Sequence, residues 1–149
     1  MATPIPAPPA DAWEPYRLTA VGFLESISQT LLAADDAMFA VADMGHCGGG
    51  VSEAECDAST DYGRRTLIEP ARSAIADHLT YMAQHPAHAC FADAYAGSAD
   101  LMALYTGWFD GWRPFGDNTA EGIAQIQRAY EILDASVSFS EMDYYGDCP

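Results

Sequence analysis

The segment from Pro86 to Trp112, PAHACFADAYAGSADLMALYTGWFDGW, restricts the possible folds of this chain more than any other. Read as a helix, it carries two apolar rows, because residues three and four apart lie on the same face. The first row is Phe91, Tyr95, Ser98, Met102, Tyr105, Phe109 and Trp112, and the second is Ala94, Gly97, Leu101, Leu104, Trp108 and Gly111. A helix with two apolar rows needs a partner on each side. This segment is therefore predicted to lie inside a helical bundle.

Two helical patterns precede this segment. The first begins near Asp11 to Pro15 and ends near Gly45, and its core row is Tyr16, Ala20, Phe23, Leu24, Ile27, Leu31, Ala34, Met38 and Val41. The second begins at Ser52, which has capping-box spacing with Glu55, or at Ser59, and it ends near His85. Its core row is Ile68, Ala71, Ile75, Leu79 and Met82. Both patterns have the period of an amphipathic helix.

A fourth helix is predicted after Asn118, with Ile123, Ile126, Tyr130, Leu133 and Val137 as its core row. We find no convincing strand and no internal repeat. The pattern predicts an all-α, single-domain, up-down-up-down four-helix bundle. It has a glycine-rich loop at Gly48–Gly50 and a proline kink at Pro70 in the second helix. Alternatively, the first two helices form an irregular layer.

The domain boundaries follow from composition. Residues 1–10, MATPIPAPPA, read as a flexible Pro/Ala leader, and residues 11–149 as one bundle domain with an acidic C-terminal tail. No apolar run approaches the ~20 residues that a membrane span needs.

Charge narrows the classes of partner. The formal net charge is -16, and all six basic residues are arginines. Such a chain has little to neutralise phosphates, so we expect no direct binding of nucleic acid. A basic protein partner is compatible with this charge. So is a weaker alternative, an acidic mimic that occupies a nucleic-acid-binding protein.

The common catalytic motifs do not occur in this sequence. There is no Glu-x-x-His pair of the di-iron bundles, no Gly-x-Ser-x-Gly and no His-Glu-x-x-His. Asp35 and Asp36 are adjacent, so they point to different sides of a helix, and we expect them to face solvent rather than act as a catalytic pair. The protein is therefore predicted not to be an enzyme.

Aromatic residues gather near the end of the central segment: Trp108, Phe109, Trp112 and Phe115. More aromatic side chains occur there than a turn needs, and part of the cluster is a candidate partner-binding patch. The leading hypothesis is thus a non-enzymatic, acidic helical interaction protein, exported or associated with the cell envelope. The alternative interpretation of the cluster is that it closes the end of the bundle core.

The alternative function is binding of a small ligand, haem or a metal. His78, Tyr81 and His85 fall at steps of three and four on one helix face, and His88 lies just beyond. Phenolate and imidazole groups both serve as axial ligands of haem iron. A structural interpretation competes with this one, because histidines near a helix C-terminus are favoured by the helix dipole.

Two short segments resemble known families. Trp108-x-x-Gly111 followed by Tyr130-x-x-x-Asp134 resembles the Trp-x-Gly turn and export signal of the small helical substrates of type VII secretion, with one extra residue in the tryptophan motif. This resemblance implies export without a signal peptide. The six residues from Tyr81 to Pro86 resemble the Tyr-x-x-x-His-Pro segment of haem-binding haemophores, which implies a haem ligand.

The four cysteines predict two disulfides, Cys47–Cys56 and Cys90–Cys148. In an up-down-up-down bundle each of these pairs lies at one end, and any other pairing would have to cross a rod of roughly 45 Å. Such pairing implies an oxidising compartment, hence a secreted or envelope protein. Two alternatives stay open: a cytoplasmic protein with four reduced thiols, or a zinc site on His46, Cys47 and Cys56 that lacks an evident fourth ligand.

Overall fold

All regular elements among the described residues are helical. The computed structural model describes residues 10–42, 44, 47, 50–112 and 119–144. The elements are α1 (Ala10–Ala42), α2 (Glu53–Tyr62), a π-helical segment (Gly63–Ile68), α3 (Glu69–Gln84), a short 3-10 turn (Ala89–Phe91), α4 (Ala92–Gly111) and α5 (Thr119–Tyr144). The prediction of an all-α fold is confirmed.

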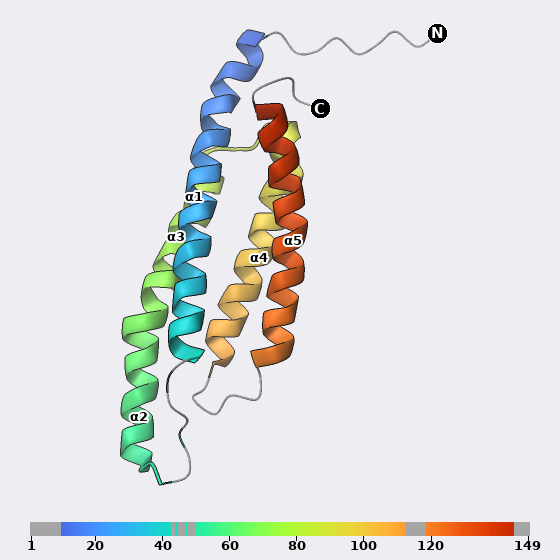
Figure 1. Ribbon diagram of the computed structural model, residues 1–149. Helices are drawn as coiled ribbons and strands as arrows, with labels where there is room; N and C mark the ends of the chain where they lie inside the picture. Colours follow the sequence, from blue (N-terminus) through green and yellow to red (C-terminus); the bar gives the residue numbers. More distant parts are fainter. Residues whose placement is uncertain (1–9, 43, 45–46, 48–49, 113–118, 145–149) are drawn as a thin grey trace.

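The helices associate mainly as two pairs. α1 packs along α3, and α4 packs along α5, as Figure 1 shows. The start of α1 and the end of α5 lie at the same end of the molecule, while α2 projects past the opposite ends of α1, α4 and α5. This projection agrees with burial, since none of the residues of α2 is buried.

The core lies where the two helix pairs meet. Its largest fully enclosed side chains are Tyr105, Phe23, Phe109, Ile68, Leu101, Met102 and His78. Burying an aliphatic or aromatic side chain of this size contributes about 1.5–3 kcal/mol, so this cluster supplies much of the force that holds the pairs together. α4 buries residues of both its apolar rows, among them Leu101, Tyr105 and Trp108, as expected for a helix with two such rows.

The first turn of α2 has the predicted capping box. The Ser52 side chain accepts a hydrogen bond from the Glu55 backbone N–H at 3.1 Å, and the Glu55 carboxylate accepts one from the Ser52 N–H at 3.1 Å. Two backbone donors that a helix N-terminus leaves without partners are thus satisfied. The start at Ser52, rather than at Ser59, is the one observed.

α2 and α3 are joined without a loop by the π-helical segment Gly63–Ile68, which the sequence pattern did not reveal. The N–H of Glu69 bonds to the carbonyl of Arg64, five residues back. α-Helical bonding resumes at once, with Pro70 in the first turn of α3, where its missing N–H costs least. The glycine-rich loop predicted before α2 lies mostly outside the described residues, as do residues 1–9.

Three side chains differ from their expected exposure. Leu79 and Tyr130 were expected in core rows, but their exposed fractions are 40% and 42%. Asp35 was expected to face solvent, yet it is half-buried and accepts a hydrogen bond from Tyr105, while its neighbour Asp36 is exposed. The pairwise packing of helices explains the exposure of Tyr130, because α1 and α5 touch each other little and leave room between them.

Candidate functional site

A polar cluster lies inside the core at His78. This side chain is fully enclosed, with Nδ1 at 2.7 Å from the Ser26 hydroxyl oxygen on α1 and Nε2 at 2.5 Å from that of Ser98 on α4. Burial lowers the pKa of His78 from 6.5 to about 4, so the imidazole is neutral at physiological pH. A neutral imidazole donates through one nitrogen and accepts at the other, which suits two hydroxyl partners.

The other residues of the predicted ligand face lie at different depths. The Tyr81 hydroxyl donates to the Thr19 carbonyl at 2.7 Å, and its ring stacks on that of His85 at 4.2 Å between centroids. His85 is exposed and its Nδ1 lies 2.9 Å from the Tyr81 carbonyl oxygen, while His88 is half-buried. Burial and the nearby charge of Glu25 raise the pKa of Tyr81, which keeps the phenol protonated.

The hydrogen bonds of His78 count against the hypothesis that this face binds haem or a metal. Both nitrogens of His78 already have hydroxyl partners, so an incoming metal would have to break a buried hydrogen bond. Within the described part of the chain, no three His, Cys, Asp or Glu side chains gather in a way that could hold a metal ion.

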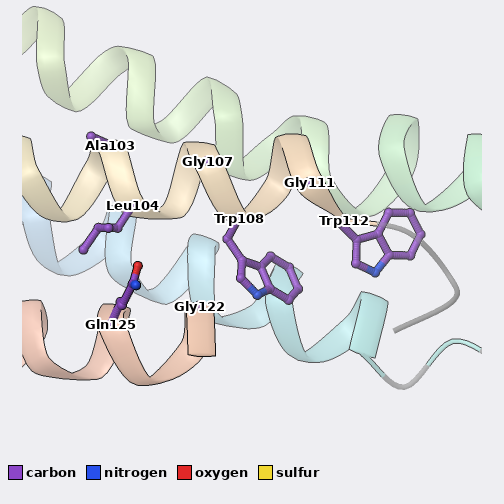
Figure 2. A pocket seen from close by; sticks show the side chains of 8 residues that line it. All are labelled: Ala103, Leu104, Gly107, Trp108, Gly111, Trp112, Gly122 and Gln125. Carbon is purple, nitrogen blue, oxygen red and sulfur yellow. The ribbon is translucent and has the colours of Figure 1, made fainter. Parts of the chain in front are cut away.

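The predicted partner-binding aromatics are largely buried. Phe109 is 1% exposed and belongs to the core, whereas Trp108 and Trp112 line a pocket of about 300 Å³ that also includes residues of α5. Figure 2 shows both indoles projecting from α4 beside Gly107 and Gly111, with Gln125 on the facing helix. Phe115 lies outside the described residues.

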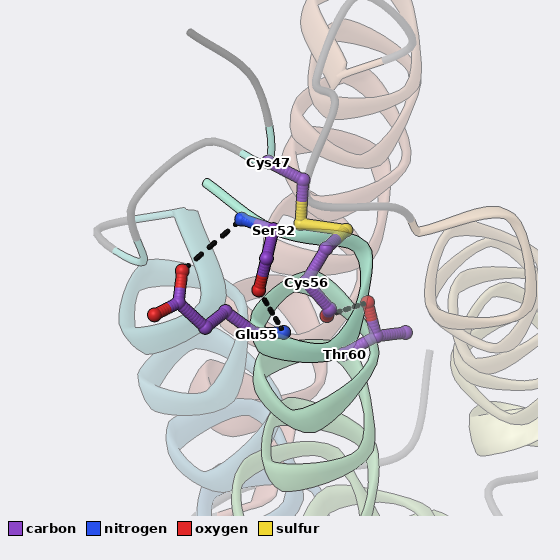
Figure 3. The surroundings of a disulfide bond; sticks show 5 residues. All are labelled: Cys47, Ser52, Glu55, Cys56 and Thr60. Atoms are coloured by element: carbon purple, nitrogen blue, oxygen red, sulfur yellow. Dashed lines mark hydrogen bonds between the residues drawn. A yellow bond between two sulfur atoms is a disulfide. The ribbon is translucent and has the colours of Figure 1, made fainter. Parts of the chain in front are cut away.

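One of the two predicted disulfides is present. Cys47 and Cys56 are bonded, with their Cα atoms 5.1 Å apart, and the bond fastens the chain after α1 to the first turn of α2 (Figure 3). The capping box of Ser52 and Glu55 lies inside this ring. The pair Cys90–Cys148 stays a prediction, because the Cys90 side chain and Cys148 lie outside what the structure describes.

A groove larger than the tryptophan pocket lies between α1 and α5. This groove has a volume of about 620 Å³ and a largely apolar and aromatic lining. It is lined by Asp35, Met38, Phe39 and Ala42 of α1, Tyr105 of α4, and Ile123, Ile126, Gln127, Tyr130 and Glu131 of α5. Phe39 is 66% exposed at its edge, and Tyr105 is buried at its floor.

Sequence reasoning missed this groove as a site. A signal was available on α1, where Leu18, Leu32 and Phe39 are separated by multiples of seven residues and share a face that is not the core row. All three are more than 60% exposed. A second apolar face on a helix that already buries a first one indicates an additional contact surface.

Comparison with protein-family models finds no matching family, and comparisons with curated proteins and with solved structures find no significant match. Among the helices described, none is both long and apolar enough to cross a membrane. The proposals that follow therefore depend on the geometry of this chain's own residues.

Proposed function

We propose that this protein is a non-enzymatic binding protein that receives a basic, amphipathic helix of a partner protein in the groove between α1 and α5. The groove itself is the observation that carries this proposal. It has a volume of about 620 Å³ and a largely apolar lining, and it exposes Phe39 and Tyr130 to solvent. Amphipathic helices commonly bind by laying an apolar face into such a groove.

Charge complementarity selects the occupant. Asp35 and Glu131 are the charged residues that line the groove, and no basic residue is among the described residues of its lining. The whole chain carries a formal charge of -16, so a second copy of it would be repelled, whereas a basic helix would be attracted. The partner helix would pack against α1 and α5 as a further member of the bundle.

The remaining features of the proposal follow from the arrangement of the chain. An up-down-up-down order makes α1 and α5 neighbours along one edge of the bundle, and this is the edge where the groove lies. The Cys47–Cys56 bond supports action in an oxidising compartment, either outside the cell or in its envelope. A second bond, Cys90–Cys148, would close the opposite end.

Binding of a designed peptide tests the proposal. The probe is a fluorescein-labelled amphipathic helix of leucine and lysine, about five turns long, and its counterpart carries glutamate in place of lysine. In about 0.15 M NaCl, where long-range attraction is screened, fluorescence anisotropy should report binding of the lysine peptide alone. Phe39→Ala together with Tyr130→Ala should weaken this binding at least tenfold.

Tyr62→Ala supplies the matched control, since Tyr62 is also a largely exposed aromatic residue but lies on α2, outside the groove. Its affinity for the lysine peptide should stay within twofold of wild type. Equal losses in both variants, or no binding of the lysine peptide, would overturn the proposal. Sedimentation of the free protein as a dimer that the Phe39→Ala change dissolves would assign the groove to a second copy instead.

A further inference from the structure

Asp35 is a half-satisfied carboxylate in an apolar setting. Its Oδ1 accepts the hydroxyl hydrogen of Tyr105, a side chain that is 1% exposed. Burial and this hydrogen bond raise the pKa of Tyr105, so the phenol stays a donor at any physiological pH. No residue in the described part of the chain donates to Oδ2 of Asp35, although the side chain lines the groove. A partly buried carboxylate oxygen without a donor favours a cationic partner.

Aromatic residues line the same groove as this carboxylate. Phe39 follows Asp35 by one helical turn on the same face of α1, and Tyr130 contributes a second ring from α5. Tyr105, which donates to Asp35, lines the groove as well. The faces of aromatic rings carry partial negative charge and attract cations. Rings and carboxylates of this kind are how proteins recognise hydrophobic organic cations.

We propose that Asp35, flanked by Phe39 and Tyr130, forms a cation-accepting subsite in the groove, where it takes an ammonium or guanidinium side chain of the partner helix. This inference rests on the proposed function, and it adds a specificity-determining residue to it. The subsite selects for charge inside the groove, whereas the apolar residues Met38, Ile123 and Ile126 accept the neutral face of the partner. An anion would meet both Asp35 and Glu131 and be rejected.

A pair of ions with the same shape and opposite charge tests the subsite directly. Tetraphenylphosphonium is a hydrophobic cation, and tetraphenylborate is its anionic counterpart. In isothermal titration calorimetry with the full chain, at about 0.15 M NaCl, the phosphonium should bind and the borate should not. Asp35→Asn keeps the side-chain shape and should weaken phosphonium binding at least tenfold.

Asp36→Asn is the control for general electrostatic attraction. It removes the same charge from the adjacent residue, which is exposed and outside the groove, so phosphonium affinity should change less than twofold. Circular dichroism checks that both variants fold. Should Asp35→Asn fail to fold, the two ions can still be compared on the wild-type protein. NMR shifts at Tyr130 then locate the bound ion and test the subsite without the variant.

Different results would contradict the subsite at Asp35 and the proposed binding of a helix. Equal binding of the two ions, or equal effects of Asp35→Asn and Asp36→Asn, would overturn the subsite. If the lysine peptide binds wild type and Asp35→Asn alike, the groove binds helices but Asp35 does not select charge. If the phosphonium binds at Asp35 and the peptide does not bind, the subsite stands as a receptor for small organic cations and the proposed function fails.

Discussion

His78 is a titratable group that the core keeps neutral between two serine hydroxyls. Its pKa is about 4 in the folded chain and 6.5 in the unfolded one, so the unfolded state binds a proton first as the pH falls. The contribution of neutral His78 to the free energy of unfolding is therefore fully present above about pH 6.5. This contribution is lost as the pH falls toward 4. The full loss is about 3 kcal/mol in the free energy of unfolding.

Urea unfolding of wild type and of His78→Gln at several pH values checks this expectation. Glutamine cannot titrate, and carboxylates titrate alike in both proteins, so the difference between the two free energies isolates His78. This difference should shrink by about 2–3 kcal/mol between pH 7 and pH 4. A difference that stays constant with pH would show that the imidazole does not lose protons on folding.

At this scale the sequence revealed residue types but not their environments. His78, Tyr81 and His85 were expected to share a face, and helical spacing does align them. Their depths differ because α4 packs directly over the His78 side chain through Ser98, and helical periodicity does not report which neighbour lies above a given turn. The same reason applies to Asp35, whose partner Tyr105 is 70 residues away in sequence.

At the scale of the helices, we expect replacement of glycine by alanine to have opposite effects on stability at two positions, Gly22 and Gly107. A Cβ atom at Gly22 on α1 would overlap the Tyr81 hydroxyl, which is held by the Thr19 carbonyl. A Cβ atom at Gly107 on α4 would meet nothing within 4 Å. Gly22→Ala should therefore destabilise the protein by about 1–3 kcal/mol, while Gly107→Ala should stabilise it by about 0.5–1 kcal/mol.

Thermal unfolding of the two variants measures both effects. Because each change adds one methyl group to a helical glycine, each variant is the control of the other. Tyr81→Phe should relieve part of the strain in Gly22→Ala, since it removes the overlapping oxygen. Stabilisation by Gly22→Ala would mean that Tyr81 does not lie across α1 as described.

The Cys47–Cys56 bond should stabilise the attachment of α2. It closes a ring of about 10 residues, which in the chain-entropy model corresponds to about 2–3 kcal/mol. Cys47→Ser with Cys56→Ser should lower the free energy of unfolding by that amount. Hydrogen exchange should show the loss mainly in α2, which buries none of its own residues. Non-reducing peptide mapping of the same samples tests Cys90–Cys148, and a Cys47–Cys90 peptide would contradict both predictions.

The limits of the helices were largely predictable, because they depend on local chemistry. The cap at Ser52 and the end of the central segment at Gly111 depend on residues within a few positions of each other. The start of that segment was expected near Pro86, whereas α4 begins at Ala92, after a 3-10 turn. The π-helical segment was not predictable in this way. Its first residue, Gly63, packs against Trp112, where a Cβ atom would lie 2.6 Å from the indole, and this contact joins residues far apart in sequence.

For the whole molecule, the formal charge of -16 predicts a stability that rises with salt. Like charges repel most in the compact state, and salt screens this repulsion. The midpoint of thermal unfolding should increase between about 0.02 M and about 0.5 M NaCl, and should respond equally to KCl. A midpoint that is unchanged, or that falls, would show that specific ion pairs such as Arg72–Asp110 outweigh the general repulsion.

The all-helical class and most core residues could be predicted, since apolar periodicity determines which face of a helix is buried. The groove could not, because it arises from how far α1 and α5 stand apart. That distance depends on the summed volumes of side chains from three helices, including Tyr105 beneath the groove. Tyr130 was therefore expected in the core. It does lie on the same helix face as Ile123 and Ile126, but that face borders the groove at this position.

The π-helical segment Gly63–Ile68 behaves as a one-residue insertion that the helix has absorbed. Removing one residue there, for example Thr66, would take out this insertion. Because each residue of an α-helix turns the chain by about 100°, α2 would then rotate by that angle relative to α3. Cys56 would turn away from Cys47 with it. The extra residue therefore sets the orientation of α2 about its own axis. The disulfide can form only while α2 keeps the orientation that turns Cys56 toward Cys47.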